Sequence, residues 1–597
     1  MNSGGISESR KSVKSFSDDD PRHIFLKRAR RMALSLMMKI ELTNIDKSAY
    51  RFVTKNIERN GVVGRIFRKD HTVWKDRDEE IGNRLGWLDA PERFAGRCGD
   101  YEAFAASVRS AGFRRVLLLG MGGSSLAPEV LSRICGPGPA GLPLDVLDST
   151  DPAAVLRFAR ELDFARTLFL VSSKSGTTLE TTALMNFFFS RTEEALGRDN
   201  AGSRFVAITD PGSGLESEAR RRGFRAVFAG DPEIGGRFSV FSSFGLLPTA
   251  LLGMETGRLL ASARAEMAVC RAERTDDNPA ALVGAVLGTL ASAGRDKVAF
   301  LLSSPLGAFG AWLEQLIAES TGKDGRGILP LVRSTGASFD RPAEDKVFIS
   351  MSLGEDPVLS GRISALAAQG APLVSLRMES PDDLGGQFYF WEFATAVAGA
   401  VLGINPFDQP NVALSKKKTE GALQRPEAEG GQTDAPPPAK TDKLILDLDG
   451  EAGPLEAGLR KFLDGRGERD YLAVQAFLPP FHEVEAALGR LAERIADRTG
   501  RPVAYDFGPR FLHSTGQIHK GDAGRGLFLQ LTASHAEDIP VPGAFEERAS
   551  PLTFGRLIDA QARGDREALR EKRRRIAHVH IEGGIVAGLR RLADAVT

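Results

Sequence analysis

Short apolar runs separated by longer helical stretches dominate the chain from Phe113 onward. Each run is long enough for a buried strand, and each intervening stretch is long enough for a helix that returns to the start of the next strand. The first series of runs lies at 115–120, 143–148, 167–173, 204–210 and 225–230. This alternation predicts a parallel sheet with helices on both faces.

Two further series follow the first. After a helical stretch near 244–293, strand-like runs recur at 297–304, 327–334, 346–352 and 372–378. Residues 416–443 then contain almost no apolar side chains and a run of prolines, which is typical of a flexible linker or a surface excursion. Beyond this segment, strand-like runs at 471–479, 502–508, 526–533 and 577–583 accompany a helical pattern at 482–498.

The pattern therefore predicts an α/β protein with two doubly wound parallel-sheet domains and a C-terminal α/β portion. We expect a polar tail and N-terminal extension at 1–60, a first domain with N-terminal helices at 61–290, a second domain at 291–415, a flexible linker at 416–443 and the C-terminal portion at 444–597. The first thirty residues are polar and rich in Ser and Asp, and we expect them to carry no function.

Composition excludes several classes of protein. The 597 residues are 42% hydrophobic and 26% charged, as in an ordinary soluble enzyme. Lys+Arg and Asp+Glu both total 78, which removes the electrostatic case for bulk nucleic-acid binding. Cys98, Cys135 and Cys270 lie too far apart for a CxxC motif, so a reducing cytoplasm fits better than a disulfide framework or a zinc site. Because the uncharged runs are too short for a bilayer, we expect no membrane association.

Two loops at predicted strand ends have the composition of phosphate-binding loops. In GMGGSS (120–125), glycines allow a tight turn before a helix, and Gly123 and Ser124 would lie where the helix offers unpaired N–H groups to an anion. The second loop, VSSKSGTT (171–178), gathers hydroxyls around one ammonium group. An ordinary strand-to-helix turn and simple N-capping remain the alternatives. Both loops are expected at the carboxyl edge of one sheet, where open α/β sheets bind ligands.

Two charged residues stand out in apolar surroundings. Arg237 follows two glycines and precedes an almost uncharged stretch, so it requires either a buried carboxylate or an oxyanion of a substrate as its partner. Gln315 and Glu319 share one face of a predicted helix, and Glu319 at the helix end could be a general base or simply a solvated glutamate. The lysines at 416–418 by themselves indicate only a solvated surface.

Taken together, the motifs resemble those of glucose-6-phosphate isomerases. GMGGSSLAPE, SSKSGTTLET, GGRFSVFSSFGL, QxxxESTGK and NPFDQPNVxxxK occur in the order found in that family, over roughly residues 60–420. The segments at 65–88 and 508–521 are similar to the isomerase half of transaldolase/glucose-6-phosphate isomerase fusion proteins. Only about 60 residues precede the first segment, whereas a transaldolase barrel requires about 250. We therefore expect an isomerase without transaldolase activity.

The resemblance implies two sugar-isomerase (SIS-type) domains that interconvert glucose 6-phosphate and fructose 6-phosphate without a metal or an organic cofactor. It also implies a homodimer. It assigns Glu319 as the base that moves a proton between C1 and C2 through a cis-enediol(ate), Arg237 as the group that stabilises this intermediate, and Lys416 as the ring-opening lysine. The positions that match the family's substrate contacts are Gly123, Ser124, Ser173, Lys174, Ser175, Thr177, Thr178, Glu180 and Gln315.

The sequence departs from the family pattern at the ring-opening histidine. That residue normally lies in a TNGQH-like motif between the Glu-bearing motif and NPFDQ, yet residues 72–481 contain no histidine. HSTGQIHKG (513–521) is the one similar string. It predicts that His519, with His513 as the second candidate, lies near Glu319 and Lys416, although both could be plain surface or core residues. A further departure is Ala413, which replaces the family's usual glutamate.

Two other functions remain open at this point. One is a SIS-type regulator that binds a sugar phosphate without catalysis, and the other is an isomerase that also accepts mannose 6-phosphate. Glu319 and Arg237 favour catalysis over sensing, because a sensor needs neither residue.

Overall fold

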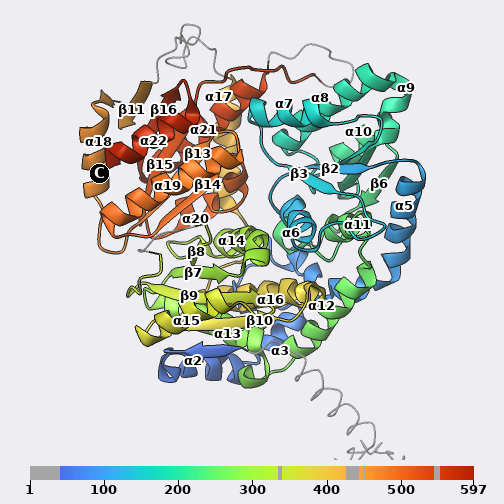
Figure 1. Cartoon of the computed structure of the whole chain (residues 1–597). Helices are drawn as coiled ribbons and strands as arrows, with labels where there is room; N and C mark the ends of the chain where they lie inside the picture. The colour runs from blue at the N-terminus through green and yellow to red at the C-terminus, as the bar shows by residue number, and fades with distance from the viewer. Residues whose placement is uncertain (1–39, 334–338, 425–442, 449–450, 544–551, 597) are drawn as a thin grey trace, which may run out of the picture.

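The computed structural model describes residues 40–333, 339–424, 443–448, 451–543 and 552–596. Within these residues the chain forms three β-sheets with flanking helices, which confirms the expected α/β class with parallel-sheet domains. Figure 1 shows the first sheet at the right, the second at the bottom and the C-terminal sheet at the upper left. The tail predicted to be without function, residues 1–30, lies outside the described residues.

The first sheet has the strand order β3-β2-β4-β5-β6, and all of its neighbouring strands are parallel. Its strands coincide with the first series of apolar runs because the side chains of the central strands are buried on both faces. Their bounds are β2 (Arg115–Gly120), β3 (Leu144–Leu147), β4 (Thr167–Ser172), β5 (Phe205–Thr209) and β6 (Ala226–Ala229). The two predicted phosphate loops follow β2 and β4, which are direct neighbours.

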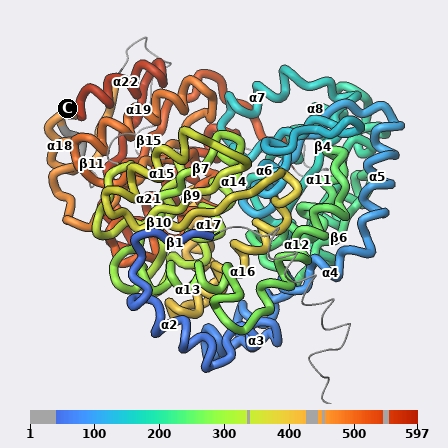
Figure 2. The backbone as a smooth tube through the Cα atoms, turned by 60° about the horizontal axis from the view of Figure 1, so that its bottom comes forward, coloured from blue at the N-terminus to red at the C-terminus, as the bar shows by residue number. Residues whose placement is uncertain are grey.

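The second sheet has the order β1-β10-β9-β7-β8. Its parallel strands are β7 (Lys297–Leu302), β8 (Leu329–Leu331), β9 (Lys346–Leu353) and β10 (Leu373–Met378). The sequence pattern did not predict β1 (Glu41–Thr43), which pairs antiparallel with β10 at the edge of the sheet. Figure 2 brings this sheet forward and shows β1 beside β10.

The third sheet, in the C-terminal part, has the order β12-β11-β16-β15-β13-β14. Its four parallel strands match the predicted runs: β13 (Tyr471–Phe477), β14 (Val503–Phe507), β15 (Gly526–Ala533) and β16 (Arg575–Glu582). The added strands β11 (Lys443–Leu448) and β12 (Glu451–Gly453) run antiparallel at one edge. The predicted helix at 482–498 is α19 (His482–Thr499), which buries one apolar face.

A packed layer of helices forms much of the core. The helical stretch near 244–293 divides into α11 (Ser243–Leu251), α12 (Thr256–Cys270) and α13 (Pro279–Ser292), and both α12 and α13 pack on α16 (Leu384–Leu402). A side chain at Gly284 would meet the Ala394 carbonyl oxygen at 2.3 Å, so glycine permits α13 to approach α16 this closely. None of the helices in the described ranges combines the length and apolar character that a membrane span requires.

Six helices carry or support the site. They are α6 (Leu126–Cys135), α8 (Leu179–Leu196), α14 (Gly307–Thr321), α17 (Pro410–Gln424), α20 (Gly516–Gly521) and α21 (Phe554–Glu571).

The first part of the predicted linker at 416–443 is in fact helical, because α17 continues to Gln424. It packs so tightly on α21 that a side chain at Gly564 would meet the Thr419 backbone nitrogen at 2.6 Å, and Lys418 pairs with Glu571 at 2.5 Å. The flexible-linker prediction was therefore wrong for this part, and residues 425–442 lie outside the described ranges.

Candidate active site

The first predicted phosphate loop packs against two other parts of the site. Gly122 has φ +55°, and a side chain there would lie 2.8 Å from Gln315 Nε2 and 3.1 Å from His513 Cβ. A side chain at Gly123 would come within 2.2 Å of the Gly236 backbone, immediately before Arg237. The two glycines thus allow the loop to approach both Arg237 and His513, which a larger residue would prevent.

The second loop is held together by its own hydroxyl groups. Ser173 Oγ donates to Thr178 Oγ1 at 3.3 Å, and the exposed hydroxyls of Ser175 and Thr177 are 2.9 Å apart. Lys174 instead points to Asp210, with which it forms an ion pair, and donates to the Asp231 carbonyl oxygen at 2.9 Å. Burial lowers the pKa of Lys174, although Asp210 favours its charged form. Lys174 is thus held by Asp210 beside the loop.

The loop after β2 places Ser124 next to the second loop. Ser124 is buried, and its carbonyl oxygen accepts a hydrogen bond of 2.9 Å from Ser172 Oγ at the end of β4. The two loops therefore lie side by side at the carboxyl edge of the first sheet, where the helices α6 and α8 begin.

Arg237 and Glu319 form a buried ion pair. Arg237 Nη1 lies 3.1 Å from Glu319 Oε1, and the two side chains are 3% and 9% exposed. The other hydrogen bonds of the guanidinium group go to Ser320 Oγ at 2.8 Å, Gln409 Oε1 at 2.9 Å, and the carbonyl oxygens of Pro406 at 2.7 Å and Asp408 at 3.0 Å. The sequence predicted an anionic partner for Arg237. In the structure this partner is Glu319, the residue that the sequence resemblance assigns as the base.

Gln315 links this ion pair to the C-terminal part of the chain. Its Nε2 donates to Glu319 Oε2 at 3.0 Å and to the His513 carbonyl oxygen at 2.7 Å. The predicted helix face that carries Gln315 and Glu319 therefore faces the site, because both residues lie one turn apart on α14.

Lys323 is a further buried cation that the sequence did not single out, although it lies in the ESTGK motif. Its Nζ donates to the Asp408 carbonyl oxygen at 2.6 Å and pairs with Asp408 Oδ1 at 2.5 Å. Burial and the charge of Arg237 lower the pKa of Lys323 to about 8. Arg237 and Lys323 thus both fasten the NPFDQ loop, residues 405–409, to the end of α14.

His513 and Glu180 form a second nearly buried pair. His513 Nε2 lies 3.0 Å from Glu180 Oε1, which also accepts a hydrogen bond of 2.9 Å from Gln561 Nε2 on α21. Burial by itself would raise the pKa of Glu180, but the attraction and hydrogen bond of His513, with a smaller contribution from Lys416, lower it to about 2. Lys416, Glu180 and His513 line one small cavity of about 50 Å³.

The prediction that His519 lies beside Glu319 and Lys416 was wrong for its side chain. His519 is 3% exposed, its Nδ1 lies 3.2 Å from Gln475 Nε2, and its ring centroid is 4.9 Å from that of Phe528 in the C-terminal sheet. Burial holds the pKa of His519 well below its usual value.

The rotation of α20 explains this orientation. Gln517 donates to the Gly322 carbonyl oxygen at 2.9 Å, and Ile518 fills the space beside Gly322. The face of α20 toward α14 is therefore occupied by these two residues, and the next residue, His519, points into the C-terminal sheet. The predicted segment lies beside Gln315 and Glu180, but the histidine that it places there is the second candidate, His513.

Comparison with known proteins shows which family the chain resembles. Residues 97–329 match the family described as phosphoglucose isomerase. The glucose-6-phosphate isomerase of Rubrobacter xylanophilus is 33% identical over 370 residues, which make up 54% of this chain and 85% of that protein. The chain belongs to the glucose-6-phosphate isomerase family. The glucose-6-phosphate isomerase of Methanocaldococcus jannaschii is 29% identical over 343 residues, or 51% of this chain and 83% of its own length.

Solved structures agree with the fold of this family. The structure of a glucose-6-phosphate isomerase from Chlamydia trachomatis has a TM-score of 0.56 at 20% identity, covering 69% of this chain and 98% of that one. A hypothetical protein from Thermus thermophilus has a TM-score of 0.55 at 25% identity, covering 65% of this chain and 100% of that one.

The family motifs do not account for two supporting residues. Arg510, at the start of the short segment that carries His513, pairs with Glu129 on α6 and lies 3.0 Å from Asp148. Gln561 accepts a hydrogen bond of 2.6 Å from Thr150 while it donates to Glu180. Arg510 lies in the segment 508–521 that resembles the fusion-type isomerases, whereas nothing in the sequence around Gln561 indicates a role.

Among the described residues, no group of three or more His, Cys, Asp or Glu side chains is arranged to hold a metal ion.

Proposed function

We propose that the protein interconverts glucose 6-phosphate and fructose 6-phosphate by ring opening followed by proton transfer between C1 and C2. The observation that carries this proposal is the buried Arg237–Glu319 pair beside two hydroxyl-rich loops. Burying an ion pair requires good geometry and full hydrogen bonding. Here every N–H group of the guanidinium donates a hydrogen bond, and the second carboxylate oxygen of Glu319, Oε2, accepts one from Gln315. A sugar-phosphate sensor would need neither charge.

The substrate phosphate binds at the two neighbouring loops in this proposal. Ser124, Ser173, Ser175, Thr177 and Thr178 provide hydroxyl and backbone donors at the ends of β2 and β4. The N-termini of α6 and α8 point toward the same sheet edge and favour an anion there. Lys174 contributes positive charge beside the loop while Asp210 holds it in position.

Ring opening requires a proton donor to O5 and an acceptor for the proton of the C1 hydroxyl. The imidazole of His513 has one nitrogen that can donate a proton and one that can accept a proton, and Glu180 orients it through the 3.0 Å contact. Lys416 lies on the same cavity wall and supplies a second positive charge. The proposal thus assigns ring opening to His513, with Glu180 and Lys416 as its neighbours.

Proton transfer then follows on the open-chain sugar. Glu319 removes the proton from C2, and the electron pair of that bond forms the C1=C2 double bond of an enediolate with negative charge on O1. Arg237 offsets this charge at short range. The O2 proton then passes to O1, directly or through water, so that O1 becomes a hydroxyl group and O2 carries the negative charge. The electrons on O2 form the C2=O bond while the C1=C2 electron pair takes the proton back from Glu319 at C1, which leaves the ketone at C2.

The proposal includes three features that rest on the sequence resemblance. They are membership of the isomerase half of the transaldolase fusion type, supported by the 508–521 segment that carries His513, assembly as a homodimer, and a place in the cytoplasm. Sedimentation velocity on the purified chain tests the dimer directly.

A coupled assay with glucose 6-phosphate and mannose 6-phosphate, each with and without EDTA, tests the activity and its substrate range. The role of Glu319 is tested by Glu319→Gln, which keeps size and hydrogen bonding but cannot accept a proton. We expect the variant to lose exchange of the C2 hydrogen with heavy water, with affinity within a few-fold.

The matched control is Asp324→Asn, which removes an exposed carboxylate that pairs with Lys75 just beyond the same helix. It should retain exchange. Exchange at the native rate in Glu319→Gln would show that another group is the base.

A further inference from the structure

A cavity of about 410 Å³ lies between the second sheet and the C-terminal sheet. Its walls include the beginnings of four strands: Lys297 starts β7, Leu329 starts β8, Tyr471 starts β13, and Arg525 immediately precedes β15. These are the amino ends of the strands, whereas the candidate active site uses the carboxyl ends in the first sheet. The volume lies within the range of small-molecule sites.

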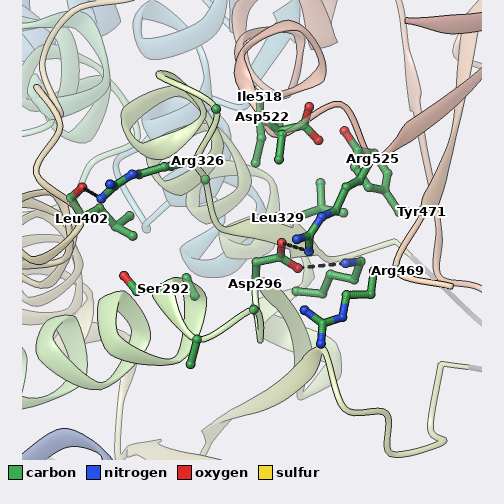
Figure 3. A pocket seen from close by; sticks show the side chains of 17 residues that line it. Ser292, Asp296, Arg326, Leu329, Leu402, Arg469, Tyr471, Ile518, Asp522 and Arg525 are labelled. Atoms are coloured by element: carbon green, nitrogen blue, oxygen red, sulfur yellow. Dashed lines mark hydrogen bonds and ion pairs between the residues drawn. The ribbon is translucent and has the colours of Figure 1, made fainter. Parts of the chain in front are cut away.

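The cationic side chains in the cavity wall outnumber the carboxylates. Asp296 pairs with Lys297 at 2.8 Å and with Arg525 at 2.9 Å, and Asp522 pairs with Arg574 at 3.0 Å. Each carboxylate in the wall is therefore already matched. Arg326 and Arg469 also line the cavity, and within the described part of the chain neither has a carboxylate partner. Figure 3 shows Arg326 at one side of the cavity and Arg469 and Arg525 reaching in from the other.

We propose that this cavity binds a small, soluble phosphorylated anion, with Arg326 and Arg469 as its principal contacts. Guanidinium groups present paired donors that match the oxygens of a phosphate, and they are weakly hydrated, so little is lost when they contact an anion. The remaining space accommodates a group of about the size of a sugar.

The same cavity is connected to the active site through Arg326. Arg326 donates to the carbonyl oxygen of Leu402, the last residue of α16, and the NPFDQ loop begins three residues later. Carbonyl oxygens of that loop, at Pro406 and Asp408, hold Arg237. Three residues before Arg326, Lys323 is bonded to the same loop.

An anion that binds Arg326 therefore changes its hydrogen bond to Leu402, and through it the position of the NPFDQ loop whose carbonyl oxygens hold Arg237. By thermodynamic reciprocity, bound anion should change the affinity for the sugar phosphate by the same factor as sugar phosphate changes the affinity for the anion. This coupling rests on the proposed function, whereas the binding site itself does not.

Calorimetric titration of the full chain with inorganic pyrophosphate tests the site. Arg469→Glu reverses an exposed charge, and Ser292→Glu adds a carboxylate at another exposed position of the cavity wall, so both variants should fold normally. We expect each to weaken the cavity's binding step at least tenfold. Arg460→Glu, an equivalent exposed arginine on α18 (Leu455–Asp464), is the control and should retain it.

Identical isotherms in all four proteins would overturn the proposal, and so would equal weakening in all three variants, which would indicate a general effect of charge. The second measurement is the Michaelis constant for glucose 6-phosphate with and without pyrophosphate. The change in this constant that pyrophosphate causes should differ from wild type in Arg469→Glu but not in Arg460→Glu. If the chain shows no isomerase activity while the cavity still binds pyrophosphate, the proposed function fails and the anion site stands.

Discussion

Ring opening of glucose 6-phosphate should depend on His513 and not on Glu319. Opening and reclosing the ring interconverts the α and β anomers, and this requires proton transfer between oxygens but none from carbon. The imidazole of His513 contacts Glu180 at 3.0 Å, while the backbone of the same residue is bonded to Gln315 at 2.7 Å. The His513→Gln variant should therefore lose catalysed anomerisation, whereas Glu319→Gln should keep it.

The expected magnitude follows from the geometry of this pair. A positioned general acid–base group typically contributes about 10² to 10⁴ in rate, so His513→Gln should slow anomerisation at least about 100-fold, or about 2.7 kcal/mol of barrier. The pKa of Glu180, about 2 instead of 4.5, corresponds to about 3 kcal/mol in favour of its charged form. Glutamine retains one hydrogen bond to Glu180, so the loss of stability should be smaller than this.

Exchange spectroscopy on glucose 6-phosphate labelled with ¹³C at C1 measures the anomerisation rate without requiring isomerisation. The comparison includes wild type, His513→Gln, Glu319→Gln and His519→Gln, each checked for folding by thermal melting. Native anomerisation in His513→Gln together with a loss in folded His519→Gln would refute the assignment and restore the expectation from sequence.

Three further predictions concern binding, pH and support of the site. Replacing Ser173 and Thr178 together by alanine should raise the Michaelis constant more than it lowers turnover, because phosphate contacts are shared by ground and transition states; an unchanged constant would place the phosphate elsewhere. The low pKa of Glu180 means that its charge stabilises the folded chain above about pH 4.5 and that this contribution disappears as the pH falls toward 2. The gap in melting temperature between wild type and Glu180→Gln should accordingly narrow on acidification, and a widening gap would contradict the assignment. Arg510→Gln leaves two partly buried carboxylates, 20% and 14% exposed, without this cationic partner and should lower the unfolding free energy by about 1.5 to 3 kcal/mol, with turnover reduced more than affinity; an unchanged urea midpoint would contradict it.

The sheets could be predicted because their strands are buried on both faces. The run predicted at 115–120 is β2 itself, and its neighbour at 167–173 differs from β4 by one residue. β1 could not be predicted, since three residues of mixed polarity show no period and owe their conformation to pairing with β10. The helical part of 416–424 was missed for a related reason: its buried face is narrow, and its packing on α21, including Thr419 against Gly564 and the Lys418–Glu571 pair, stabilises it.

The site could be predicted in part for chemical reasons. Arg237 enters an apolar stretch and therefore requires an anionic partner, either a buried carboxylate or a substrate oxyanion; the structure pairs it with Glu319. The choice between His513 and His519 could not be made in this way. Both lie in one glycine-flanked string, and the rotation of the short helix α20, set by Gln517 and Ile518 against Gly322, decides which imidazole faces the site.

The bond between Gln315 and His513 joins residues 198 positions apart in the chain. During synthesis at about 5 to 20 residues per second, the ribosome needs roughly 10 to 40 s to pass from one to the other. For nearly all of that interval the nascent polypeptide contains the two predicted phosphate loops, Arg237 and Glu319, but lacks His513, the residue to which we assign ring opening. If His513 opens the ring as proposed, conversion of the cyclic sugar phosphate can therefore begin only after this residue has been synthesised.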